Sequence, residues 1–314
     1  MKIALLEDLG VSDEYLEKQK EKLAEKSHQL IIYKKADKIE EKINQVKDAD
    51  AIILANTPLE EDVIKQANNL KFIDVAFTGV DHIPTYICHK KNIVISNASG
   101  YATHAVSELC VGFMIDLLRN IKENEQNCRT RKTKSKTIGN LLHGKTVGII
   151  GAGKIGREVA RILKAFGCYV IAYNRSKIED ENIDKQTSLD ELLKESDIVT
   201  IHCPLTKETE GLIGKKEFDQ MKKSAILINT ARGKIVNNEE LAKALNDKSI
   251  AGAGIDVFDK EPPIEINYPL FHSPNVIVSP HIGYETVESL EQRADIVFDN
   301  LYAWIEGSPK NQIK

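Results

Sequence analysis

The chain has 314 residues, of which 42% are hydrophobic and 29% are charged, and its formal net charge is −4. A chain of this length can form about two domains with buried cores. The mild acidic balance provides no electrostatic basis for binding nucleic acid or an anionic membrane surface, so we expect neither partner.

The five cysteines are scattered along the chain and lack the spacing of metal ligands. This usage is typical of reduced thiols in the cytoplasm, and it predicts no metal site. The first eight residues form a short apolar run with acidic residues after it, which is unlike a signal peptide. No apolar run approaches the length of about 20 residues needed to span a bilayer. We therefore expect a cytoplasmic protein.

Short apolar runs alternate with amphipathic helical segments in the first third of the chain. The expected elements are a strand at Ile3–Leu6, a helix at Asp13–Lys26, a strand at Gln29–Tyr33, an intervening helix, a strand at Ala51–Leu54, a helix at Glu60–Ala67, and strands at Lys71–Ala76 and Ile93–Ser96. This βαβ rhythm predicts a mostly parallel sheet. The rhythm restarts at Val147, and Asp50–Leu54 is echoed by Asp197–Ile201, which indicates two related halves.

Two segments lie between these halves. Ala102–Arg119 has apolar residues at helical spacing, which predicts a buried crossover helix. Arg129–Lys136 is strongly basic but has no interleaved aromatic residues, so a solvated loop or an oligomer arm is favoured over a polyanion site.

A glycine-rich loop follows the apolar run Val147–Ile150. Its sequence is Gly151-Ala152-Gly153-Lys154-Ile155-Gly156, and a helix is expected over Arg157–Phe166. The first glycine permits a tight turn, the second lets the backbone approach a pyrophosphate, and the third lets the helix pack against the strand. Because this loop joins an expected strand to an expected helix, it predicts a dinucleotide site.

The residues after the strand Tyr169–Tyr173 bear on the choice of dinucleotide. An NAD site usually has an acidic residue here to bind the ribose hydroxyls, but this chain has Asn174, Arg175 and Ser176. A neutral amide beside a guanidinium and a hydroxyl suits a 2′-phosphate, so NADP is favoured over NAD. The alternatives are that Arg175 only caps a surface turn, or that a carboxylate from elsewhere binds the ribose.

Polar residues follow three further apolar strands. Arg232 comes after Ala225–Asn229, Glu261 after Ile250–Val257, and His281 after Val276–Val278. Each alone has an ordinary explanation as an ion pair, a turn residue or a cap. Together they indicate an active site, because they follow a dinucleotide loop in the sequence. They also stand at strand ends, from which side chains enter an α/β cleft.

The chain carries, in order, Gly79-Val80-Asp81, the 151–156 glycine loop, HCPLT at His202–Thr206, NTARG at Asn229–Gly233, GIDVFDKEP at Gly254–Pro262 and PNVIVSPHIG at Pro274–Gly283. With these motifs it resembles the D-isomer-specific 2-hydroxyacid dehydrogenases over nearly its whole length. The resemblance implies two doubly wound parallel-sheet α/β domains with a cleft between them. It implies a flavodoxin-like substrate domain over 1–99 and 285–314, a Rossmann cofactor domain over 100–284, and a homodimer joined through the cofactor domains.

The resemblance also implies roles for individual residues. His281 is the expected acid that protonates the substrate carbonyl oxygen, Glu261 its partner that stabilises the imidazolium and fixes its tautomer, and Arg232 the fork for the substrate carboxylate. The backbone around Thr78, Gly79 and Val80 is expected to bind the same carboxylate. The expected cofactor-binding residues are Thr103, Gly151, Gly153, Lys154, Ile155, Gly156, Asn174, Arg175, Ser176, Cys203, Pro204, Thr209, Thr230, Ala231, Asp256 (which orients the carboxamide), His281 and Gly283.

The implied activity is hydride transfer between NAD(P)H and a 2-oxo acid, with glyoxylate or hydroxypyruvate preferred. A D-lactate or other D-2-hydroxyacid dehydrogenase that uses NAD remains an alternative, as does a nucleotide-sensing binding protein. Formate oxidation requires an Asn ahead of the cofactor domain and a Gln ahead of the final His, and neither is evident. Besides Asn174 in place of the usual acid, the chain departs from the family in two ways. It lacks the tryptophan near the basic segment, and it has no regulatory extension after Lys314, which argues against an end-product-inhibited form.

Overall fold

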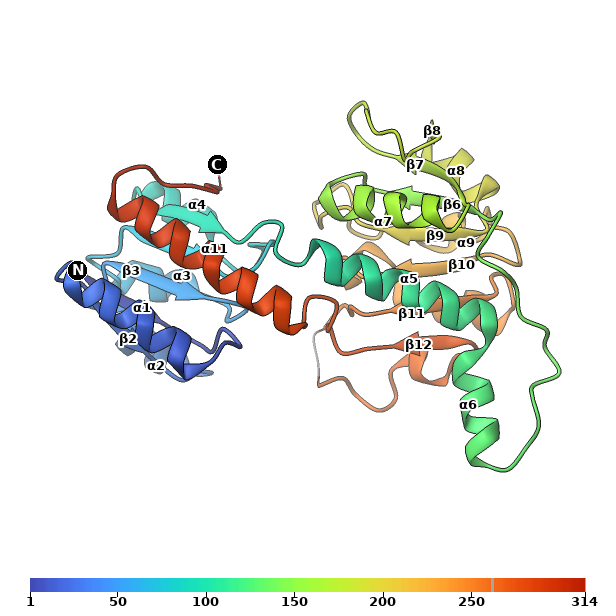
Figure 1. The fold of residues 1–314 in the computed structure, drawn as a ribbon, viewed down its shortest axis with the longest axis horizontal. Coiled ribbons are helices and arrows are strands. Elements are labelled where there is room, and N and C mark those ends of the chain that lie inside the picture. Colours follow the sequence, from blue (N-terminus) through green and yellow to red (C-terminus); the bar gives the residue numbers. More distant parts are fainter. Residues whose placement is uncertain (261–262, 314) are drawn as a thin grey trace. The chain divides into compact units, whose positions relative to one another are not determined.

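The computed structural model describes residues 1–260 and 263–313. They form two compact units, one made of Met1–Ala102 with Glu285–Lys314 and the other of Thr103–Tyr284 (Figure 1). The boundaries expected from the sequence were 99/100 and 284/285. That the first unit binds the substrate and the second binds the cofactor stays a prediction.

The first unit is a parallel five-stranded sheet in the order β2-β1-β3-β4-β5. Its elements are β1 (Lys2–Leu5), α1 (Asp13–Glu25), β2 (Gln29–Ile32), α2 (Ile39–Val46), β3 (Ala51–Leu54), α3 (Glu61–Gln66), β4 (Phe72–Val75), α4 (Thr85–Lys90), β5 (Val94–Asn97) and α11 (Val287–Ile305). Every residue of β3 and β4 is buried, as expected for strands covered by helices on both faces. The strand order is that of the flavodoxin-like fold.

The second unit is a parallel seven-stranded sheet in the order β12-β11-β10-β9-β6-β7-β8. Its elements are α5 (Thr103–Arg119), α6 (Ile121–Arg129), β6 (Thr146–Ile150), α7 (Lys154–Ala165), β7 (Tyr169–Tyr173), β8 (Lys185–Gln186), α8 (Leu189–Glu195), β9 (Ile198–Ile201), α9 (Lys215–Phe218), β10 (Ile226–Asn229), the 3₁₀ turn η1 (Gly233–Ile235), α10 (Asn238–Asn246), β11 (Gly252–Ile255), η2 (Pro269–His272) and β12 (Val276–Val278). This order extends the Rossmann arrangement by one strand. The expected doubly wound α/β class is therefore confirmed.

Alternate residues of the second sheet belong to two separate cores, one on each face. Ile149 packs with residues of α5 and α7, including Phe113 and Leu163. Its neighbour Ile150 packs on the opposite side with residues of α8, α9 and α10, including Phe218. Because successive strand residues point to opposite faces, an uninterrupted apolar run is what a strand between two helical layers requires.

The echo between the halves corresponds to a shared set of hydrogen bonds. The Asp50 carboxylate accepts from the Lys2 amide at 2.7 Å, and the Asp50 amide donates to the Lys2 carbonyl at 2.8 Å. Asp197 does the same to Thr146, at 3.0 and 2.8 Å. Each aspartate thus joins the start of one strand to the start of its neighbour, β1 with β3 and β6 with β9.

Some boundaries differ from expectation. Helix α7 begins at Lys154, three residues before the expected Arg157, because the last three residues of the glycine motif already form its first turn. Strand β11 is shorter than the expected Ile250–Val257. Strand β8 and the helices α4, α6, α8, α9, α10 and α11 were not predicted. Within the described ranges, no helix is both long and apolar enough to cross a bilayer.

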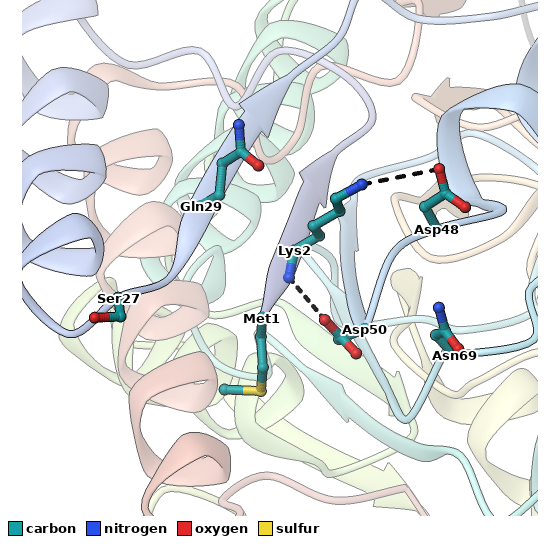
Figure 2. A pocket seen from close by; sticks show the side chains of 7 residues that line it. All are labelled: Met1, Lys2, Ser27, Gln29, Asp48, Asp50 and Asn69. Carbon is teal, nitrogen blue, oxygen red and sulfur yellow. Dashed lines mark hydrogen bonds and ion pairs between the residues drawn. The ribbon is translucent and has the colours of Figure 1, made fainter.

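A hollow of about 530 Å³ lies at the amino-terminal edge of the first sheet (Figure 2). The backbone amide of Lys2 donates to the Asp50 carboxylate there, and the Lys2 ammonium lies 3.9 Å from the Asp48 carboxylate. Ligands of doubly wound folds bind beyond the carboxyl ends of the strands, which is the opposite edge. We therefore do not assign this hollow to the active site.

Candidate functional site

Each of the three glycines in the 151–156 loop is needed for a different structural reason. Gly151 has a φ of +97°, and a Cβ on it would lie 2.5 Å from the Cys203 nitrogen. A Cβ on Gly156 would lie 2.2 Å from the Gly151 carbonyl oxygen, whereas one on Gly153 would meet no atom within 4 Å. Gly153 caps helix α7, whose first residue is Lys154. An open approach to a helix N-terminus fits a pyrophosphate, because the first-turn amides point outward.

The end of β9 packs against this glycine loop. The His202 amide donates to the Ile150 carbonyl at 2.8 Å, and the His202 ring nitrogen Nε2 lies 2.9 Å from the Thr200 hydroxyl. Burial lowers the pKa of His202 to about 3 and raises the pKa of the Cys203 thiol to about 11, so both side chains are neutral near pH 7. The Thr209 hydroxyl donates to the Pro204 carbonyl at 2.7 Å and closes the following turn.

The turn after β7 is held by its own polar groups. The Asn174 side-chain oxygen accepts from the Ala152 amide at 3.3 Å, and its NH₂ donates to the Ser176 hydroxyl at 3.0 Å. Asn174 therefore joins this turn to the glycine loop, while the Arg175 side chain is exposed. Gln186 in β8 adds a further bond, from its NH₂ to the Ser176 carbonyl at 2.9 Å.

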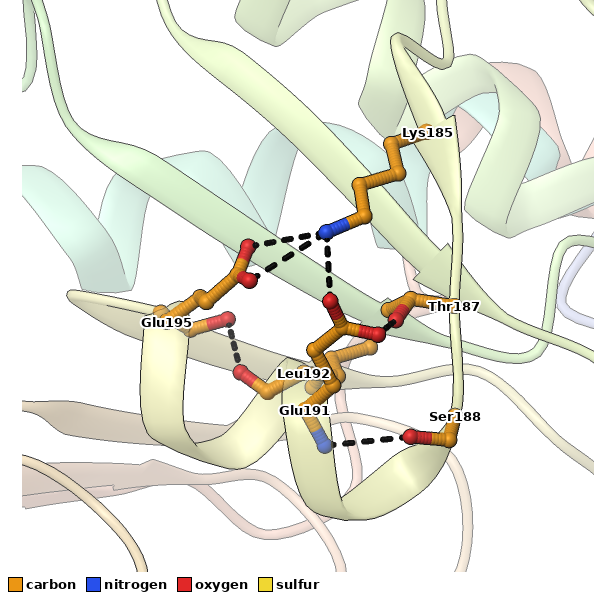
Figure 3. A network of polar contacts seen from close by, with 7 residues as sticks. Lys185, Thr187, Ser188, Glu191, Leu192 and Glu195 are labelled. Atoms are coloured by element: carbon orange, nitrogen blue, oxygen red, sulfur yellow. Dashed lines mark hydrogen bonds and ion pairs between the residues drawn. The ribbon is translucent and has the colours of Figure 1, made fainter.

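Strand β8 is in turn anchored to α8 by a polar network (Figure 3). The Lys185 ammonium contacts Glu191 at 2.7 Å and Glu195 at 3.2 Å. The Ser188 hydroxyl caps α8 by accepting from the Glu191 amide at 3.3 Å, and Thr187 also bonds to the Glu191 carboxylate. These contacts fix the short strand that carries Gln186, and so support the Asn174–Ser176 turn.

The loop after β10 positions Arg232. Asn229 holds it from within, because its side chain donates to the Arg232 carbonyl at 3.0 Å and accepts from the Ala231 amide at 3.1 Å. A Cβ on Gly233 would overlap the Phe258 carbonyl group at 1.9 Å, so the loops after β10 and β11 lie in direct backbone contact. Arg232 is partly exposed, and the Thr230 hydroxyl beside it is buried without a hydrogen-bond partner among the described residues.

Asp256 holds the loop that carries His281. Its carboxylate accepts from the Ser279 hydroxyl at 2.5 Å, the Ile282 amide at 2.9 Å and the Gly283 amide at 2.8 Å. The His281 amide donates to the Asp256 carbonyl at 2.8 Å. These bonds stabilise a left-handed φ of +60° at His281, a strained conformation for a residue other than glycine. Burial raises the pKa of Asp256, and the three loop bonds oppose that shift.

The second sheet thus gathers most of the expected residues at one edge. Because β12, β11, β10, β9 and β6 are neighbours and run parallel, the loops with His281, Asp256, Arg232, Cys203 and Gly151 all leave from their carboxyl ends. Sequence reasoning missed His202 and Gln186 as parts of this edge. The position of His202 directly after a buried strand was the available signal, whereas Gln186 gave none.

Three groups of expected residues lie elsewhere. Thr103 is the first residue of α5, and its carbonyl accepts from the Ser107 hydroxyl at 2.7 Å. Thr78, Gly79 and Val80 belong to the first unit and follow β4 at the carboxyl edge of that sheet. Glu261 lies outside the described residues.

Comparisons with known proteins agree with this geometry. A family model for the NAD-binding domain of D-isomer specific 2-hydroxyacid dehydrogenases matches residues 111–283. Glyoxylate reductase of Thermococcus litoralis is 36% identical over 307 residues, 93% of this chain and 92% of that protein. Hydroxypyruvate reductase of Blautia hydrogenotrophica is 33% identical over 285 residues, 88% of each. A solved acyclic imino acid reductase in complex with NADPH and D-arginine has a TM-score of 0.91 and 27% identity, over the whole of both chains.

The contrast between two glycines of the loop can be tested by substitution. In Gly153→Ala the new methyl group meets no protein atom, so we expect the free energy of unfolding to change by less than about 0.5 kcal/mol. The same methyl group occupies the approach to the helix N-terminus, and the dinucleotide Kd should rise about tenfold or more. Gly156→Ala should instead destabilise the fold by about 1–3 kcal/mol, because backbone must move. Thermal unfolding and dinucleotide titration measure both; unchanged binding by Gly153→Ala would contradict the assignment.

Proposed function

This chain belongs to the D-isomer specific 2-hydroxyacid dehydrogenase family, and we propose that it reduces glyoxylate or hydroxypyruvate with a nicotinamide dinucleotide. The observation that carries the proposal is the Asp256-anchored loop, which presents His281 at the same sheet edge as the glycine loop. The relatives named glyoxylate reductase and hydroxypyruvate reductase support the choice of substrate.

The chemistry assigns separate tasks to the residues at this edge. A bound reduced nicotinamide supplies the hydride that adds to the carbonyl carbon of the 2-oxo acid. Negative charge then develops on the carbonyl oxygen, and His281 donates the proton that neutralises it. Arg232 holds the substrate carboxylate with its planar fork and stabilises the developing charge. Asp256 keeps His281 in its strained backbone conformation, so the imidazole does not have to reorganise during the reaction.

Two further assignments rest on the family pattern. We assign Glu261 as the carboxylate that stabilises the His281 imidazolium and fixes its tautomer. We assign the amides of Thr78, Gly79 and Val80 as a second set of donors to the substrate carboxylate. Within the described residues these three amides donate no hydrogen bond, which leaves them available for an anion.

A panel of 2-oxo acids tests the proposal, with glyoxylate, hydroxypyruvate, pyruvate and phenylpyruvate assayed against NADH and NADPH. We expect the highest kcat/KM with one of the first two. Arg232→Lys should lower that value about 100-fold or more, because a point charge cannot reproduce the bidentate geometry. Lys234→Ala, an exposed neighbour in the same loop, is the matched control. Preference for pyruvate would favour a D-lactate dehydrogenase, and no turnover of any acid would refute the enzyme.

For the cofactor, we propose that NADPH is preferred over NADH. No carboxylate occupies the turn after β7, and Arg175 is exposed there beside the Ser176 hydroxyl. Since Asn174 is already bonded to Ala152 and Ser176, we assign the contact with a 2′-phosphate to Arg175 and Ser176. A solved relative binds NADPH, whereas the matching family model is described as NAD binding, so either dinucleotide suits this fold.

Arg175→Ala should therefore raise KM for NADPH about tenfold while KM for NADH changes less than about twofold, because only one dinucleotide carries the extra phosphate. Lys177→Ala removes an exposed charge two residues away and serves as the control. Steady-state kinetics with both dinucleotides measures the ratio. A ratio unaffected by Arg175→Ala would overturn the preference.

We further propose a homodimer formed through an arm of the second unit, made of α6 and residues 130–142. Figure 1 shows α6 and the following loop extending away from the sheet of that unit. Helix α6 has no buried residue, and Ile121, Ile138 and Leu141 are 48%, 90% and 68% exposed. Apolar side chains on a protruding segment are typical of a surface that a second subunit covers. The basic residues of Arg129–Lys136 lie on this arm.

Light scattering of the purified protein should give the mass of a dimer. Ile138→Asp should lower the measured mass towards that of the monomer, because a charge buried in the interface without a partner opposes association. Lys134→Ala, an exposed polar position on the same arm, should leave the mass unchanged. A monomeric wild-type protein at micromolar concentration would disprove the dimer.

A further inference from the structure

Residues 309–313 pair with strand β5 at the border of the first sheet. The Asn97 amide donates to the Asn311 carbonyl at 3.1 Å, and the Ile313 amide donates to the Ile95 carbonyl at 2.9 Å. The bridge between Ser96 and Gln312 is antiparallel, in contrast to the parallel strands of the sheet. The Ser96 hydroxyl also donates to the Lys310 carbonyl at 2.7 Å.

A chain of side-chain amides leads inward from this segment. The Asn311 NH₂ donates to the Asn300 side-chain oxygen at 2.8 Å. The Asn300 NH₂ donates to the backbone carbonyl of Asn97 at 3.0 Å. The Asn97 NH₂ then donates to the Thr78 carbonyl at 2.7 Å. Asn300 is fully buried and Asn97 is 7% exposed, so water does not compete effectively for the bonds that these two side chains donate. The chain therefore links Asn311 to the loop after β4.

Asp74 lies beside the centre of this chain. It is fully buried in β4, and one of its oxygens accepts from the Asn300 NH₂ at 3.1 Å. Burial raises the pKa of Asp74 well above its usual range, and the bond from Asn300 opposes that shift. The Asp74 oxygen is thus a second acceptor for the Asn300 NH₂ and helps to hold Asn300 in place.

The bond to Thr78 has a geometric consequence for the next residue. The Thr78 carbonyl and the Gly79 amide belong to one planar trans peptide unit, so they point in opposite directions. A donor that fixes the direction of the carbonyl also fixes the direction of the Gly79 N–H. Glycine has no Cβ to restrict its backbone, and an external bond is an effective way to orient this unit.

The preceding residue of the loop is held independently. The Arg293 guanidinium lies 5.5 Å from the Phe77 ring centre and 5.8 Å from the Tyr101 ring centre. Arg293 also donates to the Leu9 carbonyl at 2.6 Å. These contacts restrain Phe77, and the bond from Asn97 acts on the Thr78–Gly79 peptide that follows it.

We propose that residues 309–313 are a positioning element for the substrate-binding loop, acting through Asn311, Asn300 and Asn97 on the Thr78–Gly79 peptide. The inference rests on the proposed function, because it assumes that the Gly79 N–H receives the carboxylate of a 2-oxo acid. None of the three asparagines needs to touch the substrate. Their effect is to hold one donor in the direction that a carboxylate requires, before the substrate arrives.

The test compares Asn311→Ala and Asn97→Ala with Gln312→Ala. Gln312 lies on the same segment, but its side chain bonds only to the Pro309 carbonyl among the described residues. In the first two variants KM for the 2-oxo acid should rise about three- to tenfold, as expected for the loss of one hydrogen bond. KM for the dinucleotide should stay within about twofold of wild type. Gln312→Ala should leave both constants unchanged.

A second measurement does not depend on activity. In protein labelled with ¹⁵N-glycine, the Gly79 amide resonance, assigned with Gly79→Ala, should shift or broaden in Asn311→Ala and Asn97→Ala. The Gly151 and Gly156 resonances should not change. If Asn97→Ala does not fold, Asn311→Ala still decides the matter, because its side chain is on the exposed segment.

The outcomes separate the two proposals. If the wild type reduces 2-oxo acids but both variants keep its KM and its Gly79 resonance while Tm falls, the asparagines have a purely structural role and the inference is overturned. If the wild type reduces no 2-oxo acid, the proposed function fails. The Gly79 resonance of the two variants then shows by itself whether residues 309–313 orient the loop. If that resonance is the same as in the wild type, the positioning role is overturned as well.

Discussion

The contact between Gly151 and the backbone of His202 and Cys203 is the constraint on which the second unit depends. Strands β6 and β9 are neighbours at the point where the strand order reverses, so their following segments leave towards opposite faces of the sheet. No side chain fits at Gly151, and the partly buried His202 stays in place against Thr200. The glycine loop and the segment after β9 are therefore in direct backbone contact. Helix α7 begins at Lys154, directly after this contact, so the same short glycine motif fixes both the contact and the helix N-terminus.

Local patterns were sufficient for much of the fold. Strands β3, β7 and β12 have the bounds expected from their apolar runs, because a strand between two helical layers needs every residue to be apolar. The loops with Arg232 and His281 were found for a related reason, since polar residues after buried strands stand out. The long-range polar contacts were not predictable. Gln186 and Asn97 are ordinary surface-type residues in sequence, and their partners are determined only by the tertiary fold.

The two units share one hydrogen-bond arrangement between central strands of their sheets, and it does not depend on function. Asp50 and Asp197 each use a carboxylate and an amide to hold the first residue of the neighbouring strand. Asp184 repeats the arrangement between β7 and β8, where its carboxylate accepts from the Val170 amide at 2.7 Å. A slip of one residue would turn every apolar side chain to the wrong face, so a bond that fixes the register at the start of a strand protects the whole core.

The antiparallel pairing of residues 311–313 with β5 also affects how the first unit behaves in a crowded solution. An uncovered outer strand offers its amides and carbonyls to any extended chain, and this is a common start of aggregation. Here the protein's own backbone occupies that border of the sheet. The opposite border is the four-residue β2, and Lys34 and Lys35 follow it after Tyr33. Shortness and positive charge discourage a foreign strand there, so the first unit is protected against intermolecular β-pairing on both sides.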